Sequence, residues 1–242
     1  IEYEAVHEIH GWDDLRDRLD LDRRCFAFMH PAMPGEPVVF VEIALVTGPP
    51  ESLAELLDRT APACDPADAD TAVFYSITSC QSGLAGINLG NALLKEVVAE
   101  LRRQLPNLER FVTLSPIPSL RDADLPLPEE VRVALADDGW LTDSEREDRV
   151  REPLLRATAA YLTTAVDGRV ADPVANFHLS NGASVDAVRW RANTEDYGLP
   201  PRIASNAETY ASGEAVPTSD DVRALADPDQ RTQGGASSGS MS

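Results

Sequence analysis

Two short segments of the chain carry side chains that could do chemistry. "SPIP" begins at Ser115, and "DPVANFHLSNGA", residues 172–183, contains His178. A hydroxyl and an imidazole together can hydrogen bond a developing negative charge and move a proton. Each also has an ordinary structural reading. Ser115 could cap the end of a strand before Pro116, and a lone histidine beside Phe177 is more often a hydrogen-bonded structural side chain. Only the joint pattern favours catalysis.

A glycine loop, "QSGLAG" at residues 81–86, follows a predicted strand and precedes a predicted helix. Backbone amides of such a loop and of the first helical turn point at a bound phosphate. At Gly83 and Gly86 we expect conformations or close approaches that a side chain would block. The spacing fits neither GxGxxG nor GxxxxGK[ST], so a dinucleotide fold and a P-loop are not predicted. The predicted pyrophosphate-binding residues are Gln81, Ser82, Gly83, Leu84, Ala85 and Gly86. The alternative is a turn whose glycines serve packing.

The charge balance limits the partners. The chain has 41 acidic and 21 basic residues, a formal net charge of −20. This acidity argues against nucleic acid and anionic membranes as partners, whereas backbone amides can still hold a small anion. The longest apolar run, 38–46, is too short to span a membrane. The cysteines form neither a disulfide framework nor a zinc pattern, no two histidines have metal-ligand spacing, and a reducing cytoplasm is the simplest setting. No metal site is predicted.

The elements around these segments predict an α+β fold with a mixed central β-sheet flanked by helices. A hairpin of strands at 23–30 and 36–46 precedes a short helix at 51–59 and a strand at 71–78. Glu42 is expected at a wet sheet face. The helix after the glycine loop leads to a strand at 109–115, a crossover that implies parallel or neighbouring strands. Helices follow at 128–139 and 144–166, and Pro153 is expected to break or kink the second. Residues 172–183 are predicted to be extended, with a tight turn at Asn181-Gly182.

Several segments, in this order along the chain, resemble the catalytic domain of malonyl-CoA decarboxylase. They are "YEAVHEIHGWDDLRDRLDLDRRCFAFMHPAMPGEPVVFVEIAL", "FYSITSCQSGLAGINLGNALLKEVV", "FVTLSPIPSL" and "DPVANFHLSNGA". The glycine loop also resembles the loop by which the GNAT acetyltransferase superfamily cradles the pyrophosphate of coenzyme A. The resemblance implies a GNAT-like catalytic domain, here 1–228, that an N-terminal helical domain normally precedes. Since the sequence begins at Ile1 without that domain, we interpret it as a fragment. Residues 229–242, rich in Gly and Ser, are expected to be disordered.

The resemblance also implies the chemistry. Ser115 and His178 correspond to the family's catalytic serine and histidine. Loss of CO₂ from malonyl-CoA leaves an enolate on the thioester, so we expect Ser115 to hydrogen bond the malonyl carboxylate or thioester oxygen. His178 would orient the malonyl group and supply the proton that yields acetyl-CoA. Ser76 and Asn181 are expected to contact the substrate. No metal, biotin or other cofactor is expected, because the thioester itself delocalises the charge.

The chain departs from the family pattern at three places. Ser119 and Leu120 follow "SPIP" where Gly-Phe is common, Asn88 stands where members can carry a glutamate, and the tyrosine-containing segment after the histidine is shortened, with Tyr210 as a replacement candidate. Two alternatives therefore stay open, a GNAT-type acyl-CoA-dependent acyltransferase and a non-catalytic CoA-binding domain. A homo-oligomer and acceptance of methylmalonyl-CoA are left open as well.

Overall fold

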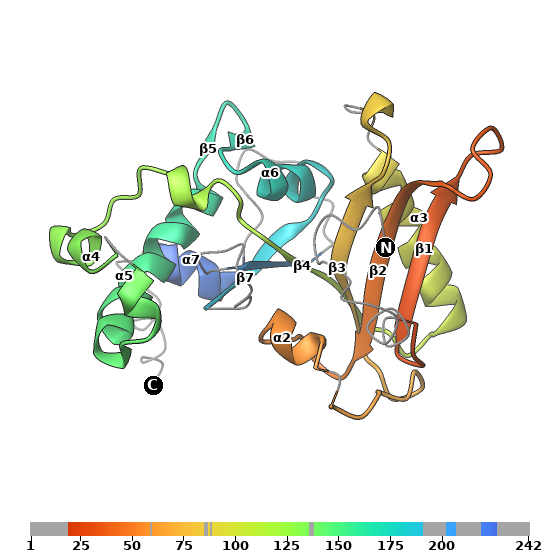
Figure 1. Ribbon diagram of the computed structural model, residues 1–242, viewed down its shortest axis with the longest axis horizontal. Helices are drawn as coiled ribbons and strands as arrows, with labels where there is room; N and C mark the ends of the chain where they lie inside the picture. Colours follow the sequence, from red (N-terminus) through yellow and green to blue (C-terminus); the bar gives the residue numbers. More distant parts are fainter. Residues whose placement is uncertain are drawn as a thin grey trace, which may run out of the picture. The chain divides into compact units, whose positions relative to one another are not determined.

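The structure is a computed structural model that describes residues 19–58, 60–84, 87, 89–135, 138–190, 202–206 and 219–226. These residues divide into two compact units (Figure 1). Unit 1 extends to Ser115 and includes Asn206, and unit 2 begins at Pro116. The single catalytic domain predicted over 1–228 remains a prediction, and the predicted tail lies outside the described residues.

Unit 1 is built on a mixed sheet with the strand order β1-β2-β3-β4. The strands are β1 (Arg23–Met29), β2 (Pro37–Val46), β3 (Thr71–Ser79) and β4 (Arg110–Ser115). The first three pair antiparallel, and β3 pairs with β4 in parallel. The largely apolar stretch 38–45 lies within β2 and buries consecutive residues such as Ile43, Ala44 and Leu45, as expected for a strand covered on both faces. The predicted hairpin and α+β class are confirmed.

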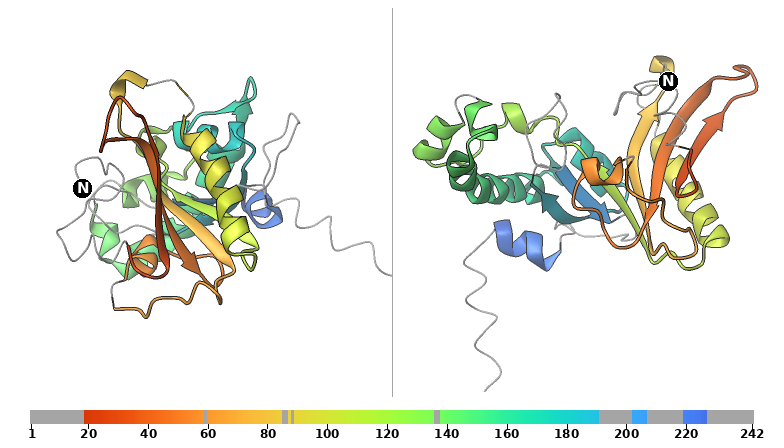
Figure 2. Two further views of the ribbon diagram at one scale, coloured as in Figure 1. Left: turned by 90° about the vertical axis from the view of Figure 1, so that its right-hand side faces the viewer. Right: turned by 60° about the horizontal axis from the view of Figure 1, so that its bottom comes forward.

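The crossover between β3 and β4 is α3 (Leu89–Gln104), because parallel neighbours cannot be joined by a tight turn. The helix buries one apolar stripe at helical spacing: Leu93, Leu94, Val97 and Leu101. Figure 2 shows α3 lying along one face of the sheet. The short helix before β3, α2 (Leu53–Leu56), is a single turn, capped by Ser52 Oγ, which accepts from the backbone N–H of Glu55 at 3.0 Å.

The two parallel strands separate towards their carboxyl ends. The β2–β3 register passes from Glu42↔Ser76 to Ile43↔Phe74, so Tyr75 is an extra residue that bulges β3. The β3–β4 pairing runs from Thr71↔Arg110 to Phe74↔Thr113, although β3 continues to Ser79. A bulge bends and twists its strand, and β4 runs away from the upper part of β3 in Figure 1. The expectation that Glu42 is solvated is wrong: packing around β2 leaves this residue 6% exposed.

Unit 2 is mainly helical. Its elements are η2 (Leu120–Asp122), α4 (Glu129–Ala134), η3 (Asp138–Leu141), α5 (Ser144–Thr163), β5 (Ala165–Val166), β6 (Arg169–Val170), α6 (Pro173–Ser180), β7 (Ser184–Arg189), β8 (Arg202–Asn206, of which Asn206 is assigned to unit 1) and α7 (Asp220–Ala226). β5 pairs with β6, and β8 neighbours β7. Leu154, Leu162, Val185 and Val222 belong to one core cluster, so α5, β7 and α7 share that core. In the described part of the chain, no helix is both long and apolar enough to cross a membrane.

Helix α5 is continuous through Pro153, so a break at this residue is wrong, and the alternative of a kink stays a prediction. An interior proline removes one backbone hydrogen bond and crowds the preceding turn. Here Val150 and Leu154, on either side of Pro153, are buried, and tertiary packing of this apolar face holds the helix together. The helix starts where the sequence predicts, since Asp143 caps it by accepting from the backbone N–H groups of Glu145 and Arg146.

The segment predicted to be extended, 172–183, is instead helix α6 followed by a turn. Asp172 is its N-cap, and Pro173 is its first residue, a position where the missing proline N–H costs nothing. The prediction of an extended segment is therefore wrong, because Asp-Pro before an apolar run is a signal for the start of a helix. The turn at Asn181-Gly182 is confirmed, and Gly182 has a φ of +95° that favours glycine.

Candidate active site

The glycine loop follows β3 directly. Its described part is the 3₁₀ turn Ser82–Leu84, closed by the backbone N–H of Leu84, which donates to the Gln81 carbonyl at 3.0 Å. The Gln81 side chain reaches across to the start of β2, where Nε2 donates to the Pro37 carbonyl at 3.1 Å. Gln81 therefore ties the loop to the neighbouring strand. Ala85 and Gly86 lie outside the described residues.

Gly83 does not meet the conformational expectation. Its φ is outside the left-handed region, and a Cβ added there would find no protein atom within 4 Å. The fold itself therefore does not require glycine at this position, and that part of the prediction is wrong. Ser82 and Gly83 are both exposed, so their backbone borders open space. That a bound ligand approaches the backbone of Gly83 too closely for a side chain stays a prediction.

Ser115 is the last residue of β4 and is 6% exposed. Because β3 and β4 are parallel, the glycine loop and Ser115 lie at the same edge of the sheet. Ser76 precedes the loop on β3 and is buried, with its Oγ 3.3 Å from Thr78 Oγ1. Unit 1 thus groups Ser76, the glycine loop and Ser115 along the part of the sheet where the parallel strands separate.

His178 and Asn181 belong to unit 2, at the carboxyl end of α6. His178 is 5% exposed, and its ring meets the Phe177 ring edge-on at 5.1 Å between centroids. Asn181 is the C-cap of α6: its Nδ2 donates to the Phe177 carbonyl at 2.7 Å, and its backbone N–H donates to the His178 carbonyl at 3.1 Å. Ser115 and His178 lie in different units, so their predicted pairing stays a prediction.

Burial sets the protonation state of His178. It lowers the pKa of the imidazole from 6.5 to about 4, and the negative charge of Asp172 opposes this shift only partly. At neutral pH the ring is therefore uncharged, with one nitrogen that donates a hydrogen bond and one that accepts. In the free protein His178 can orient and hydrogen bond an oxyanion, but it does not hold a spare proton as an imidazolium.

Asp172 is a buried residue near His178 that sequence reasoning did not assign. It is fully buried, and its Oδ2 accepts from the backbone N–H of Ser119 at 3.3 Å and from Ser119 Oγ at 2.6 Å. Tyr161 OH lies 3.0 Å from the same Ser119 oxygen. Two features of the sequence could have indicated Asp172: the Asp-Pro pair, which signals the start of a helix, and Ser119, which stands after "SPIP" where glycine is common in the family. In the described ranges, no three His, Cys, Asp or Glu side chains are placed to hold a metal ion.

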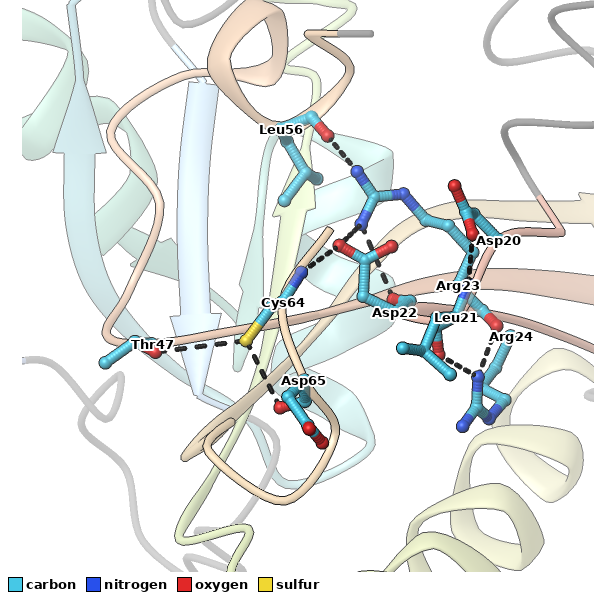
Figure 3. Close-up of polar contacts among 9 residues, drawn as sticks. All are labelled: Asp20, Leu21, Asp22, Arg23, Arg24, Thr47, Leu56, Cys64 and Asp65. Atoms are coloured by element: carbon cyan, nitrogen blue, oxygen red, sulfur yellow. Dashed lines mark hydrogen bonds and ion pairs between the residues drawn. The ribbon is translucent and has the colours of Figure 1, made fainter. Parts of the chain in front are cut away.

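A cavity of about 280 Å³ in unit 1 lies away from these residues. It is bordered by the start of β1, the end of β2 and α2, at the sheet edge opposite the glycine loop. In Figure 3, Asp22 accepts from the backbone N–H of Cys64 and pairs with Arg23, whose guanidinium also donates to the Leu56 carbonyl. The charged residues of its lining are four acids, Asp20, Asp22, Glu55 and Asp58, against the single base Arg23, a balance that is unfavourable for a CoA ester.

Comparison with known proteins identifies the family. Residues 1–232 match the malonyl-CoA decarboxylase C-terminal domain family, and the chain belongs to it. The mitochondrial malonyl-CoA decarboxylase of the goose Anser anser anser is 34% identical over 230 residues, covering 81% of this chain and 45% of that protein. The chain therefore spans about half the length of this curated relative.

Solved structures of bacterial malonyl-CoA decarboxylases share the fold. The Agrobacterium vitis protein has a TM-score of 0.83 at 40% identity, covering 93% of this chain and 62% of that one. The Rhodopseudomonas palustris protein has a TM-score of 0.78 at 39% identity, covering 92% and 61%. The mixed sheet and flanking helices described above are thus those of malonyl-CoA decarboxylases.

Proposed function

We propose that this chain decarboxylates malonyl-CoA to acetyl-CoA and CO₂. The observation that carries the proposal is membership of the malonyl-CoA decarboxylase family over nearly the whole chain. The site supports it, because a glycine loop and Ser115 share the sheet edge where two parallel strands separate. Such an edge is the common ligand site of parallel strands.

The proposed chemistry needs little more than hydrogen bonds. Backbone amides of residues 81–86 hold the pyrophosphate of the CoA ester, and Ser76 and Asn181 contact the substrate. When the carboxylate leaves as CO₂, the electron pair of the broken C–C bond moves into the thioester as an enolate. The hydroxyl of Ser115 and the neutral N–H of His178 stabilise that oxyanion. One proton, ultimately from solvent, then reaches carbon through the imidazole and yields acetyl-CoA.

We further propose that the reaction uses no metal, biotin or other cofactor, because the thioester carbonyl already accepts the electron pair. We place the protein in the cytoplasm, although the goose and rat relatives are named as mitochondrial enzymes. Its high negative charge favours small-molecule partners over nucleic acid or membranes. A homo-oligomer remains open.

The test is CO₂ release from malonyl-CoA by the purified chain. Ser115→Ala and His178→Ala should each lower the rate by about 100-fold or more, the loss typical of removing an oxyanion donor. Ser180→Ala and His30→Ala are matched controls on exposed side chains and should leave the rate unchanged. Full activity in both site variants would overturn the proposal. Acceptor-dependent thiol release from acetyl-CoA without CO₂ would indicate an acyltransferase, and CoA binding without turnover a binding domain.

A further inference from the structure

One buried carboxylate in unit 2 connects the two segments that carry the proposed chemistry. Oδ1 of Asp172 accepts from the backbone N–H groups of Val174 at 3.0 Å and Ala175 at 2.9 Å, the first turn of α6. Oδ2 accepts from the backbone N–H and the hydroxyl of Ser119. Both oxygens of a fully buried side chain are thus occupied, one by each segment.

The two segments are those of His178 and of the chain that follows Ser115. His178 lies on α6, six residues after Asp172, and Ser119 comes four residues after Ser115. The connecting residues 116–118 include Pro116 and Pro118, whose rings restrict φ and stiffen the path. Residues 116–118 and helix α6 are both conformationally restricted, and Asp172 is the hydrogen-bonded link between the segment that ends at Ser119 and the helix that carries His178.

A third element contributes to this link. The 2.6 Å contact between Ser119 Oγ and Asp172 Oδ2 has the length of a charge-assisted hydrogen bond, in which the hydroxyl donates to the carboxylate. The Ser119 oxygen can then accept from Tyr161 OH of α5 at 3.0 Å. The chain of donors runs from Tyr161 through Ser119 to Asp172, and its middle member, the Ser119 hydroxyl, would be absent if glycine followed "SPIP".

We propose that Asp172 is a positioning residue for the decarboxylation. By binding Ser119 and the first turn of α6 at once, it holds the His178 helix in one place relative to the segment that follows Ser115. This inference rests on the proposed role of His178. Asp172 does not itself act on the substrate; it acts through the placement of the imidazole.

Asp172→Ser separates positioning from helix capping. Serine is as good an N-cap as aspartate, but its single oxygen cannot also serve Ser119. Asp143→Ser is the matched control, because Asp143 caps α5 through two backbone N–H groups, at 3.1 and 3.2 Å. We expect Asp172→Ser to lower kcat about 10-fold or more, the effect of a displaced catalytic group, with KM for malonyl-CoA changed less than about threefold. Asp143→Ser should leave kcat within about twofold of the unmodified chain.

Equal kcat in the two serine variants would overturn the proposal and leave Asp172 a helix cap. If Asp172→Ser fails to fold, Ser119→Ala tests the positioning role instead, because Asp172 still caps α6 in that variant. We expect Ser119→Ala to lower kcat, and Ser119→Thr, which keeps a hydroxyl, to have a kcat close to that of the unmodified chain. Unchanged kcat in Ser119→Ala would contradict the proposal. The proposed function is judged separately, because only full activity in both Ser115→Ala and His178→Ala rejects it. Full activity of His178→Ala alone rejects the positioning role, which rests on His178. An inactive His178→Ala with fully active Asp172→Ser and Ser119→Ala likewise rejects only the positioning role.

Discussion

At the scale of single residues, the buried imidazole of His178 makes stability depend on pH. Its pKa is about 4 in the folded protein, against about 6.5 unfolded, so the folded state resists protonation. The protonation equilibrium of His178 leaves stability almost unchanged well above pH 6.5, and stability is lost as pH falls from there towards 4. Between about pH 7.5 and about pH 5 the chain should lose about 2 kcal/mol more unfolding free energy than His178→Asn. Urea denaturation of both proteins at both pH values measures this difference. Equal losses would show that the ring protonates freely in the folded protein.

At the scale of elements, the glycine loop depends on the neighbouring strand. Gln81→Ala removes the hydrogen bond to the Pro37 carbonyl, which stabilises the loop by about 1 kcal/mol, so the Kd for CoA should rise about fivefold. Calorimetric titration measures this change. Asn107→Ala is the matched control. Asn107 lies before β4, and its Nδ2 donates to the carbonyls of Pro66 and Ala69, which lie before β3. Both variants should melt earlier, but only Gln81→Ala should bind CoA more weakly. An unchanged Kd for CoA in Gln81→Ala would show that the hydrogen bond between Gln81 and Pro37 does not contribute to CoA binding.

At the scale of the whole molecule, the charge of −20 repels a polyanionic ligand. Backbone amides attract phosphate only at short range, so they do not offset repulsion at a distance. Raising the ionic strength from about 10 mM to about 150 mM shortens the screening length from about 30 to about 8 Å. The association rate constant for CoA should therefore increase with salt, the reverse of a protein that steers anions with a basic surface. Stopped-flow binding at both ionic strengths measures it, and a decrease would reveal a local cationic surface that dominates the net charge.

The predictions that succeeded concern elements whose evidence is local. The apolar runs of β1 and β2 around a Pro/Gly turn, and the 3.6-residue spacing of Leu94, Val97 and Leu101, define unit 1 without knowledge of distant contacts. One failure arose where a local rule competes with packing, and another where a local signal was not used. Pro153 was expected to break or kink its helix, yet buried neighbours keep α5 continuous. The segment that forms α6 was predicted to be extended although its Asp-Pro pair is a local signal for the start of a helix.

The amino-acid sequence alone was enough to show the resemblance to the family, in the Ser115 and His178 segments, and to predict the first hairpin and the crossover helix of unit 1, because motifs and periodicity are properties of neighbouring residues. It could not reveal that His178 is neutral, that Gly83 borders open space, or that Asp172 accepts hydrogen bonds from Ser119, 53 residues away. Burial and long-range partners exist only once distant segments pack against one another. Desolvation and hydrogen bonding of side chains are set by that packing.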